Sequence, residues 1–360
     1  MVVIFKPTLR CNIKCAHCYV GDAALDYSDM TVEAAKGILN KFPKAEVVLH
    51  GGEPTLMGAG FYEEIARDML DRHTFSMQTN LTLLDAGWIP FIREILRNRL
   101  STSFDVYRSL RPIDKTSWIE RIDLLKRNDI FPYVVSMLWK CNQDRAEDIY
   151  DFFSALGLSF RLNYVENMGY ATRNGFESLR HEDMKYAESV KAIFDMWFMN
   201  PQAEILVDPC AEVLSFMLLG NSVRKCPFTA GCFAHILSVN PNGDVYPCGG
   251  FDGFKSFRYG NLLIQSLSEI TSSQGYMESG QRYLKLPDHC RTCGFFCFCE
   301  GGCRLEAWSY YGDIYRETSM CGEYKAIFSH IESRMNREKG DIEDWWMSLL
   351  GKRQTHIMGS

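Results

Sequence analysis

Short apolar runs alternate with amphipathic stretches through the first two-thirds of the chain. Runs rich in β-branched and aromatic residues predict strands at 2–5, 46–50, 74–79, 100–105, 133–138 and 158–163. Helical spacing between them predicts helices near 31–42, 61–72, 86–98, 116–128 and 145–156, the first beginning at Thr31. Strands that are each followed by a helix indicate right-handed βαβ units and a parallel sheet. The spacing alone leaves an open doubly wound sheet and a partial barrel equally possible.

The density of turn residues and cysteines changes near residue 205. Residues 180–200 predict one more helix, whereas turns become dense after Cys210. Nine of the 14 cysteines fall between residues 226 and 321, and the stretch after them has a charged, helical pattern. We therefore expect a barrel-type domain over 1–205, a small cysteine-rich α+β domain over 206–321, and a helical tail over 322–360.

Charge and composition argue against partners such as nucleic acids and membranes. The 360 residues carry a net charge of -6, and the basic residues are scattered, so we expect no nucleic-acid partner. The apolar run before Lys6 is too short for a signal peptide or a membrane span, so we expect no membrane partner and a cytoplasmic location. In a reducing compartment, clustered cysteines favour metal ligation over disulfides.

Three of the cysteines follow the first predicted strand directly. Cys11, Cys15 and Cys18 are spaced C-x3-C-x2-C. Three thiolates can hold three irons of a 4Fe–4S cube and leave the fourth iron open to a small molecule. The alternative is a zinc site that takes a fourth ligand such as His17. The place of the loop, after a barrel-type strand where active sites are built, favours the cluster.

The segment CNIKCAHCYV resembles the cluster loop of radical S-adenosylmethionine enzymes, with His17 at a position that is usually aromatic. This resemblance implies a partial (β/α)6 barrel of the TIM type and S-adenosylmethionine bound to the open iron. In that family, one electron splits the cofactor, and the resulting 5′-deoxyadenosyl radical abstracts a hydrogen atom from the substrate. An external electron donor of the flavodoxin or ferredoxin type is implied as a partner.

Three later segments are similar to the same family in the same order: GGEPTL (51–56), SMQTNLTLL (76–84) and STSFD (101–105). The resemblance implies that the two glycines let the backbone approach the methionine moiety and that Glu53 receives its amino group. Each polar residue taken alone is more often a loop cap at a strand end. The residues implied in the cofactor or substrate pocket are His17, Gly51, Gly52, Glu53, Pro54, Gln78, Asn80, Ser103 and Asp105.

The later cysteines resemble the SPASM domain, which is found in anaerobic sulfatase-maturating enzymes and peptide maturases. The resemblance implies two further 4Fe–4S clusters with four thiolates each, and so three clusters in the chain. A pair of zinc ribbons is the alternative. The implied ligands are Cys226, Cys232, Cys248 and Cys303 for the first auxiliary cluster, and Cys290, Cys293, Cys299 and Cys321 for the second.

Three cysteines remain outside these sets: Cys141, Cys210 and Cys297. A free cysteine is usually a small apolar residue. Cys141 lies just past the fifth predicted strand, where a thiol facing the barrel mouth could return a hydrogen atom to a substrate radical. It is therefore the candidate hydrogen donor.

Two positions separate this chain from the sulfatase maturases. In that group, an aspartate that acts as a base follows the cysteine of VYPC, but here the residue is Gly249, which cannot be a general base. His50 also stands where those enzymes commonly carry glutamine. Sulfatase-type formylglycine maturation is therefore the least favoured of the reactions.

The favoured substrate is a ribosomal precursor peptide, modified oxidatively and by cross-linking. The alternative is epimerisation, dehydrogenation or rearrangement of a sugar or another small molecule. The first predicted strand begins at residue 2, so we expect a peptide leader to be bound by the barrel, by the 164–225 region or by a separate protein. A non-catalytic iron–sulfur scaffold is disfavoured by Glu53 and the open three-cysteine loop.

Overall fold

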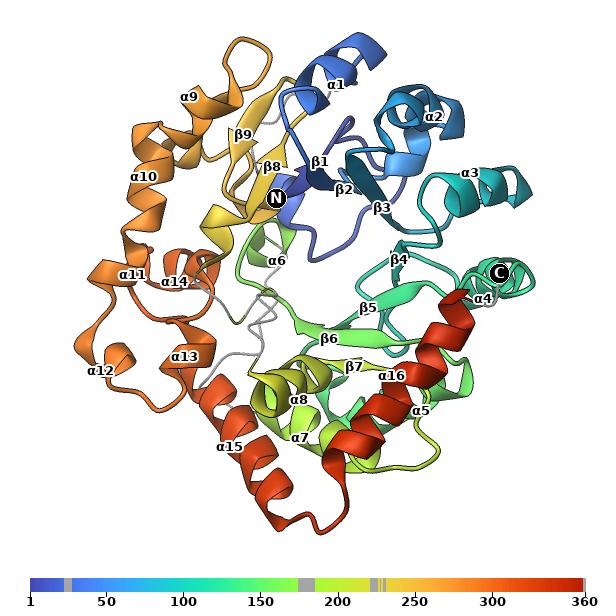
Figure 1. The fold of residues 1–360 in the computed structure, drawn as a ribbon, viewed down its shortest axis with the longest axis vertical. Helices are drawn as coiled ribbons and strands as arrows, with labels where there is room; N and C mark the ends of the chain where they lie inside the picture. The colour runs from blue at the N-terminus through green and yellow to red at the C-terminus, as the bar shows by residue number, and fades with distance from the viewer. Residues whose placement is uncertain (23–27, 174–184, 221–225, 227, 229–230, 359–360) are drawn as a thin grey trace.

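The computed structural model describes residues 1–22, 28–173, 185–220, 226, 228 and 231–358. Its centre is a sheet in the order β10-β9-β8-β1-β2-β3-β4-β5-β6-β7. The strands expected from the sequence form its middle and run parallel, with helices outside them (Figure 1). They are β1 (Val2–Phe5), β2 (Ala45–Leu49), β3 (His73–Thr79), β4 (Leu100–Ser103), β5 (Tyr133–Leu138) and β6 (Phe160–Tyr164). The predicted partial barrel is confirmed.

Each of the first five of these strands, β1 to β5, is followed by the helix that the sequence predicts. Thr31 caps the first helix, because its side-chain oxygen accepts a hydrogen bond from the backbone N–H of Ala34 at 3.2 Å. Apolar residues of these helices, such as Ile38 and Ile122, are fully buried. The helices are α1 (Val32–Leu39), α2 (Ala59–Ala66), α3 (Ile89–Glu94), α4 (Lys115–Lys126) and α5 (Ala146–Ala155).

The parallel register brings the carboxyl ends of successive strands to one edge of the sheet. Val3 lies beside Val47, and Phe5 beside Leu49, in the pairing of β1 with β2. The two β1 side chains are fully buried, which fixes the face that β1 turns to the core. The loops that leave β1 to β6 at this edge carry the residues of the site described below.

The sheet continues past the domain boundary that we expected near residue 205. β7 (Val207–Asp208) pairs with β6, and β8 (Ile236–Val239) pairs in parallel with β1. β9 (Asp244–Tyr246) and β10 (Gly260–Asn261) extend this edge as antiparallel strands. Strands from the cysteine-rich part therefore complete the barrel sheet on the side of β1.

Helices make up most of the remaining described chain. The helix expected at 180–200 is α7 (Lys185–Trp197), and residues 180–184 lie outside the described residues. The expected helical tail is a pair of helices, of which α15 packs on α7 and α8. The other helices are α6 (Tyr170–Arg173), α8 (Cys210–Leu219), α9 (Leu267–Thr271), α10 (Gln274–Gly280), α11 (Arg282–Lys285), α12 (Asp288–Arg291), α13 (Phe296–Cys299), α14 (Arg304–Tyr311), α15 (Cys321–Arg337) and α16 (Ile342–Met358).

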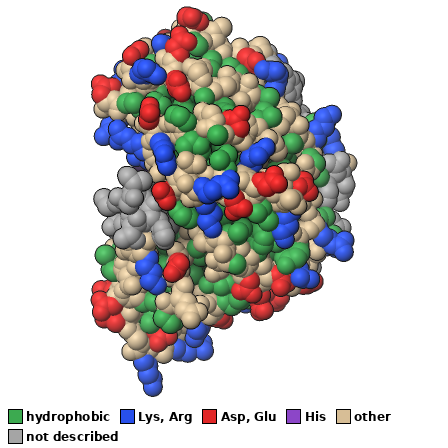
Figure 2. Space-filling view, turned by 90° about the vertical axis from the view of Figure 1, so that its right-hand side faces the viewer, with side chains coloured by type: hydrophobic (Ala, Val, Ile, Leu, Met, Phe, Trp, Pro, Cys, Tyr) green, Lys and Arg blue, Asp and Glu red, His purple; other side chains and the backbone are tan. Residues whose placement is uncertain are grey.

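The surface mixes charges of both signs. On the face drawn in Figure 2, Lys and Arg side chains lie interspersed with Asp and Glu. Within the described residues, no helix is long and apolar enough to cross a membrane.

Candidate active site and cysteine groups

The first three cysteines lie in one loop at the carboxyl end of β1. The backbone N–H of Cys18 donates to the carbonyl of Cys15 at 3.2 Å, and Ala16 N–H donates to the carbonyl of Leu110 at 2.8 Å. Burial raises the pKa of Cys15 to about 12, with a smaller raising effect from the neighbouring Cys18 and Cys11 thiols. The loop therefore brings the three predicted thiol ligands into one neighbourhood.

The GGEP segment after β2 lies directly against the chain that leads into this loop. A Cβ at Gly51 would stand 2.1 Å from the Thr8 carbonyl oxygen, and one at Gly52 would stand 2.2 Å from that of Arg10. Gly52 N–H donates to Thr8 O at 3.1 Å, and Glu53 N–H donates to Arg10 O at 2.9 Å. The glycines are therefore required for this close backbone contact, and their approach to a methionine moiety stays a prediction.

The carboxylate of Glu53 ties the end of β2 to the end of β3. It is buried, and it accepts hydrogen bonds from Thr55 N–H at 3.0 Å, Thr55 Oγ1 at 2.5 Å, Thr79 Oγ1 at 2.7 Å and Asn80 N–H at 2.8 Å. Three of these donors engage Oε1 and one engages Oε2, so Oε2 keeps a lone pair for a further donor. Pro54 begins the 3-10 helix that follows. Sequence reasoning did not find Thr55 and Thr79, although both stand beside residues that it selected.

Polar residues at the ends of β3 and β4 are joined by hydrogen bonds, and their contact with a cofactor or substrate stays a prediction. Asn80 Nδ2 donates to the Oδ1 of Asn12 at 3.0 Å, next to the first cysteine, and Gln78 Nε2 donates to Ser103 Oγ at 2.9 Å. Asn12 in turn donates to Thr82 Oγ1 at 2.7 Å. Asn80 therefore positions the cysteine loop through Asn12, which the sequence analysis did not select.

Asp105 contacts residues of its own chain on the neighbouring loop and on β5. Its buried carboxylate forms an ion pair with Arg111 and accepts from Met137 N–H at 2.8 Å and Leu110 N–H at 3.3 Å. The same Arg111 lies near His17, whose pKa falls to about 3 because of burial and, secondly, this guanidinium. Asp105 thus holds the loop on which the cysteine loop rests, and its contact with a cofactor stays a prediction.

A buried ion pair that the sequence did not reveal lies beneath the site. Lys6 at the end of β1 pairs with Asp252, and both are almost fully enclosed. The Lys6 Nζ is also 5.5 Å from the centre of the Tyr19 ring. A Cβ at Gly249 would stand 2.8 Å from Lys6 Nζ and 3.0 Å from Tyr19 Oη. Position 249 therefore has no room for a side chain while Lys6 and Tyr19 keep their places.

His50 lies beside this pair at the end of β2. Gly51 N–H donates to its Nδ1 at 2.8 Å. Burial, and secondly the charge of Lys6, lower the pKa of His50 to about 4. The ring is therefore neutral near pH 7.

The segment after β6 packs on the cysteine loop. Tyr170 N–H donates to the Cys18 carbonyl at 3.0 Å, and a Cβ at Gly169 would stand 2.3 Å from the same oxygen. Met168 packs in a small apolar cluster with Tyr19 and Cys303. Glu166, two residues earlier, has its pKa raised to about 8 by burial first and by Cys303 second. This segment therefore lies between the first cysteine loop and the cysteine-rich part.

The first auxiliary set is gathered in one place. Cys303 is the main neighbour that raises the pKa of Cys226, and Cys232 and Cys248 also lie close enough to raise it. Cys248 also packs with Cys303 in the apolar cluster that contains Tyr19. The four cysteines assigned by resemblance to one cluster are therefore neighbours, on the side that faces the first loop.

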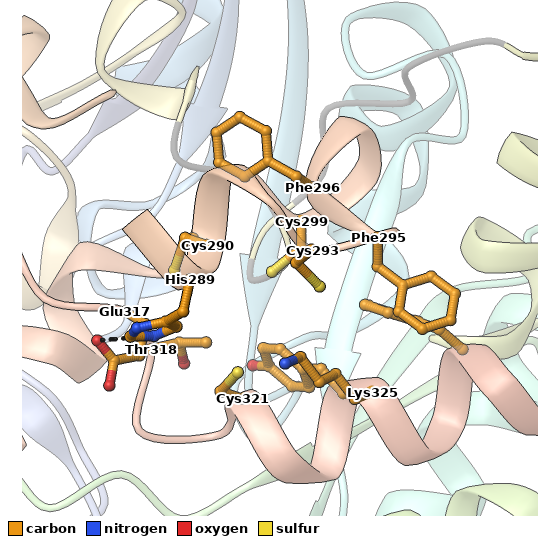
Figure 3. A pocket seen from close by; sticks show the side chains of 13 residues that line it. His289, Cys290, Cys293, Phe295, Phe296, Cys299, Glu317, Thr318, Cys321 and Lys325 are labelled. Atoms are coloured by element: carbon orange, nitrogen blue, oxygen red, sulfur yellow. Dashed lines mark ion pairs between the residues drawn. The ribbon is translucent and has the colours of Figure 1, made fainter. Parts of the chain in front are cut away.

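The second auxiliary set lines a pocket between α12, α13 and α15. In Figure 3, the side chains of Cys290, Cys293, Cys299 and Cys321 project toward the same space. Lys325 on α15 lines the same pocket. The second group of four predicted ligands is thus also brought together, with α15 supplying the last of them.

The three other cysteines are not members of these groups, although Cys297 lies on α13 together with Cys299. Cys210 is buried at the start of α8, where its Sγ is 3.7 Å from the Val190 carbonyl oxygen, so it is a core residue. Cys297 is exposed. Cys141 is exposed on the turn after β5, and its role as a hydrogen donor stays a prediction.

The donor atoms of the three groups suit iron–sulfur clusters. Cysteine thiolates are the ligands of such clusters, and the groups contain three, four and four of them. Among the described residues, no group of three or more His, Cys, Asp or Glu side chains is arranged around a single metal ion. The assignment of iron–sulfur clusters to these groups therefore rests on the type and number of their ligands, which are all cysteine thiolates.

Comparisons with known proteins agree with this arrangement. Residues 5–153 match the description of the radical SAM superfamily, and residues 232–294 match that of SPASM, an iron–sulfur cluster-binding domain. A cysteine-type anaerobic sulfatase-maturating enzyme of Clostridium perfringens is 24% identical over 373 residues, which cover 95% of this chain and 99% of that protein.

Two solved structures share the fold. Native anSMEcpe with bound AdoMet and the Cp18Cys peptide is similar with a TM-score of 0.78 and 22% identity, covering 93% of this chain and 97% of that one. Streptococcus suis SuiB bound to the precursor peptide SuiA is similar with a TM-score of 0.61 and 18% identity, covering 84% and 72%.

Proposed function

This chain is a radical S-adenosylmethionine enzyme with a SPASM domain, and from that premise we propose that it oxidatively modifies, by cross-linking, a ribosomal precursor peptide. Cys11, Cys15 and Cys18 hold the cluster that binds S-adenosylmethionine. An external flavodoxin- or ferredoxin-type protein supplies the electron. The reaction takes place at the carboxyl edge of the sheet, where the loops of β1 to β6 meet.

The observation that carries the proposal is the gathering of the eight C-terminal cysteines into two groups of four. Each group has enough thiolates for a complete 4Fe–4S cluster, which gives three clusters in all. Bond formation after hydrogen abstraction leaves one surplus electron, and a nearby cluster is a natural acceptor. Cys248 and Cys303 pack with Tyr19, next to the first cysteine loop, so the first auxiliary group is close to the site of radical formation.

Position 249 argues against the sulfatase reaction. The sulfatase maturases place their base there, whereas this chain has a glycine enclosed by Lys6 Nζ and Tyr19 Oη. Asp252, the acidic residue nearby, is occupied by its ion pair with Lys6. A sulfatase-type base is therefore absent from that position, although a sulfatase-maturating enzyme is among the relatives.

Peptide complexes of two similar structures support a peptide substrate. anSMEcpe has been solved with a peptide, and SuiB with its precursor peptide. Here the 164–225 region would form the variable wall of the substrate pocket. Residues 174–184 and 221–225 of that region lie outside the described residues.

The test uses anaerobically reconstituted enzyme and the peptides encoded beside its gene. We expect about 12 irons per chain, 5′-deoxyadenosine on reduction, and the loss of a pair of hydrogen atoms from one peptide by mass spectrometry. A cysteine peptide of the sulfatase type is incubated in parallel. Conversion of that peptide to formylglycine, or turnover of a sugar with no change in any neighbouring peptide, would overturn the proposal.

The variant with Cys11, Cys15 and Cys18 all changed to alanine is the matched control. It should retain roughly two-thirds of the iron and form no 5′-deoxyadenosine, because the other two clusters keep their own thiolates. About four irons in the native chain, with zinc making up the difference, would contradict the assignment of the auxiliary clusters.

A further inference from the structure

Two arginines are almost completely buried around the cysteine-rich part. Arg282 is 1% exposed and Arg304 is 2% exposed. A buried guanidinium is costly unless its N–H groups find acceptors. The acceptors of these two side chains differ, and the difference points to distinct roles.

Arg282 is satisfied by backbone carbonyls alone. It donates to the carbonyl oxygens of Gly301 at 3.1 Å, Gly302 at 2.7 Å and Arg316 at 2.8 Å, and also to that of Ile314. The carbonyls of Gly301 and Gly302 directly precede Cys303, and those of Ile314 and Arg316 follow α14. Arg282 is therefore a structural residue that shapes the backbone between the two cysteine groups.

Arg304 is directed at sulfur. It is the first residue of α14, directly after Cys303, and its Nη2 donates to the Sγ of Cys232 at 3.4 Å. Its guanidinium carbon is also 5.9 Å from the centre of the Phe233 ring. Among the described residues, its Nε and Nη1 have no hydrogen-bond partner. Two buried charged donors are thus left beside four cysteine thiols.

We propose that Arg304 donates hydrogen bonds to the sulfur atoms of the auxiliary cluster held by Cys226, Cys232, Cys248 and Cys303, and thereby raises the reduction potential of that cluster. The inference rests on the proposed function only in assigning a cluster to these cysteines. Cluster sulfur atoms are the acceptors that would satisfy the two N–H groups without partners. Arg304 is a positioning and tuning residue, since it ligates no iron itself.

The direction of the effect follows from charge. Reduction adds a negative charge to a cluster, and a fixed cation close to it stabilises the reduced form more than the oxidised form. Hydrogen bonds to cluster sulfurs and exclusion of solvent act on the potential as well. With Arg304 in place, the cluster nearest to the first cysteine loop is a better acceptor for a single electron.

The experiment measures potentials and needs no substrate. In the background of the Cys11, Cys15 and Cys18 alanine variant, two clusters remain, and their midpoint potentials are followed by anaerobic redox titration with electron paramagnetic resonance. Arg304→Gln should move one midpoint to a more negative value and leave the other unchanged. Arg304→Lys should give an intermediate value, because it keeps the charge but loses the planar set of donors.

Arg258→Gln is the matched control, since Arg258 is a half-exposed arginine of the same domain that pairs with Asp244. It should change neither midpoint. Unchanged midpoints in Arg304→Gln at full iron content would overturn the inference. If that variant loses iron, the test is made with Arg304→Lys. A more negative midpoint potential of one cluster in Arg304→Lys supports the inference, and unchanged midpoint potentials overturn it. Failure of the peptide reaction would leave these results intact.

Discussion

At the scale of single residues, the least expected feature is a lysine with no access to solvent. Lys6 stands at the carboxyl end of β1, where it pairs with Asp252 from the loop after β9. Burial acts against its charge, but Asp252 first and Tyr19 second raise its pKa above the ordinary value. Lys6 therefore keeps its charge beside Asp252, and its Nζ helps to enclose Gly249.

Replacing Asp252 should be strongly destabilising. Asp252→Asn leaves Lys6 as an uncompensated buried charge, and breaking such a pair costs about 3–5 kcal/mol. Urea unfolding followed by circular dichroism under anaerobic conditions measures this loss. Asp148→Asn breaks the exposed Arg145–Asp148 pair and should cost less than about 1 kcal/mol. Equal losses in the two variants would contradict the account of Lys6.

Sequence patterns revealed the residues with local signals and not their distant partners. The cysteine spacing and the glycines of GGEP could be read directly, because spacing and residue type are local properties. The partnership of Glu53 with Thr79 and that of Asn80 with Asn12 depend on which strand ends meet in the fold. No local pattern encodes such meetings.

At the scale of elements, the segment after β6 packs against the cysteine loop and fixes its position. Gly169 has a φ of 57° and no space for a Cβ beside the Cys18 carbonyl. Gly157, after α5, has a similar φ of 67° but nothing within 4 Å of its hypothetical Cβ. A side chain at either glycine would strain the backbone. At Gly169 it would also clash with the Cys18 carbonyl.

Gly169→Ala should therefore impair catalysis more than Gly157→Ala does. Displacing the Cys18 segment by about 1 Å should slow 5′-deoxyadenosine formation on the order of 10- to 100-fold. Gly157→Ala should cost about 1–2 kcal/mol in unfolding free energy and leave the rate unchanged. The two measurements are cofactor cleavage by chromatography and urea unfolding. A rate loss shared by both variants would assign the effect to backbone strain.

The order of strands and helices along the chain was easier to predict from the sequence than the pairing of the strands. Each predicted strand of the barrel half is present within a few residues, because alternating burial selects β-branched and aromatic residues. The pairing of β8 with β1 could not be predicted, since it joins Leu237 to Val3 across most of the chain. The boundary expected at 205 rested on composition, and the sheet runs across it.

At the scale of the whole molecule, β1 is an interior strand only while the cysteine-rich part is present. Val3 and Phe5 lie beside Leu237 and Val239, and all four side chains are fully buried. On the opposite side, α15 covers the barrel through the Tyr164 and Tyr324 hydroxyls, which are 2.7 Å apart. Two separate parts of the C-terminal half therefore complete the core of the N-terminal half.

A fragment ending at residue 205 should consequently fail to fold as a unit. It would expose the whole β1 edge and the apolar surface under α15, and an exposed edge of buried residues promotes aggregation. We expect no cooperative thermal transition by circular dichroism and elution as aggregate in size-exclusion chromatography. A chain ending at residue 340 removes only α16, so it should keep a cooperative transition at a lower Tm, because Trp345 and Trp346 no longer cover Trp197. A monomeric 1–205 fragment with a cooperative transition would show instead that the barrel half is an independent domain and that β8 merely extends it.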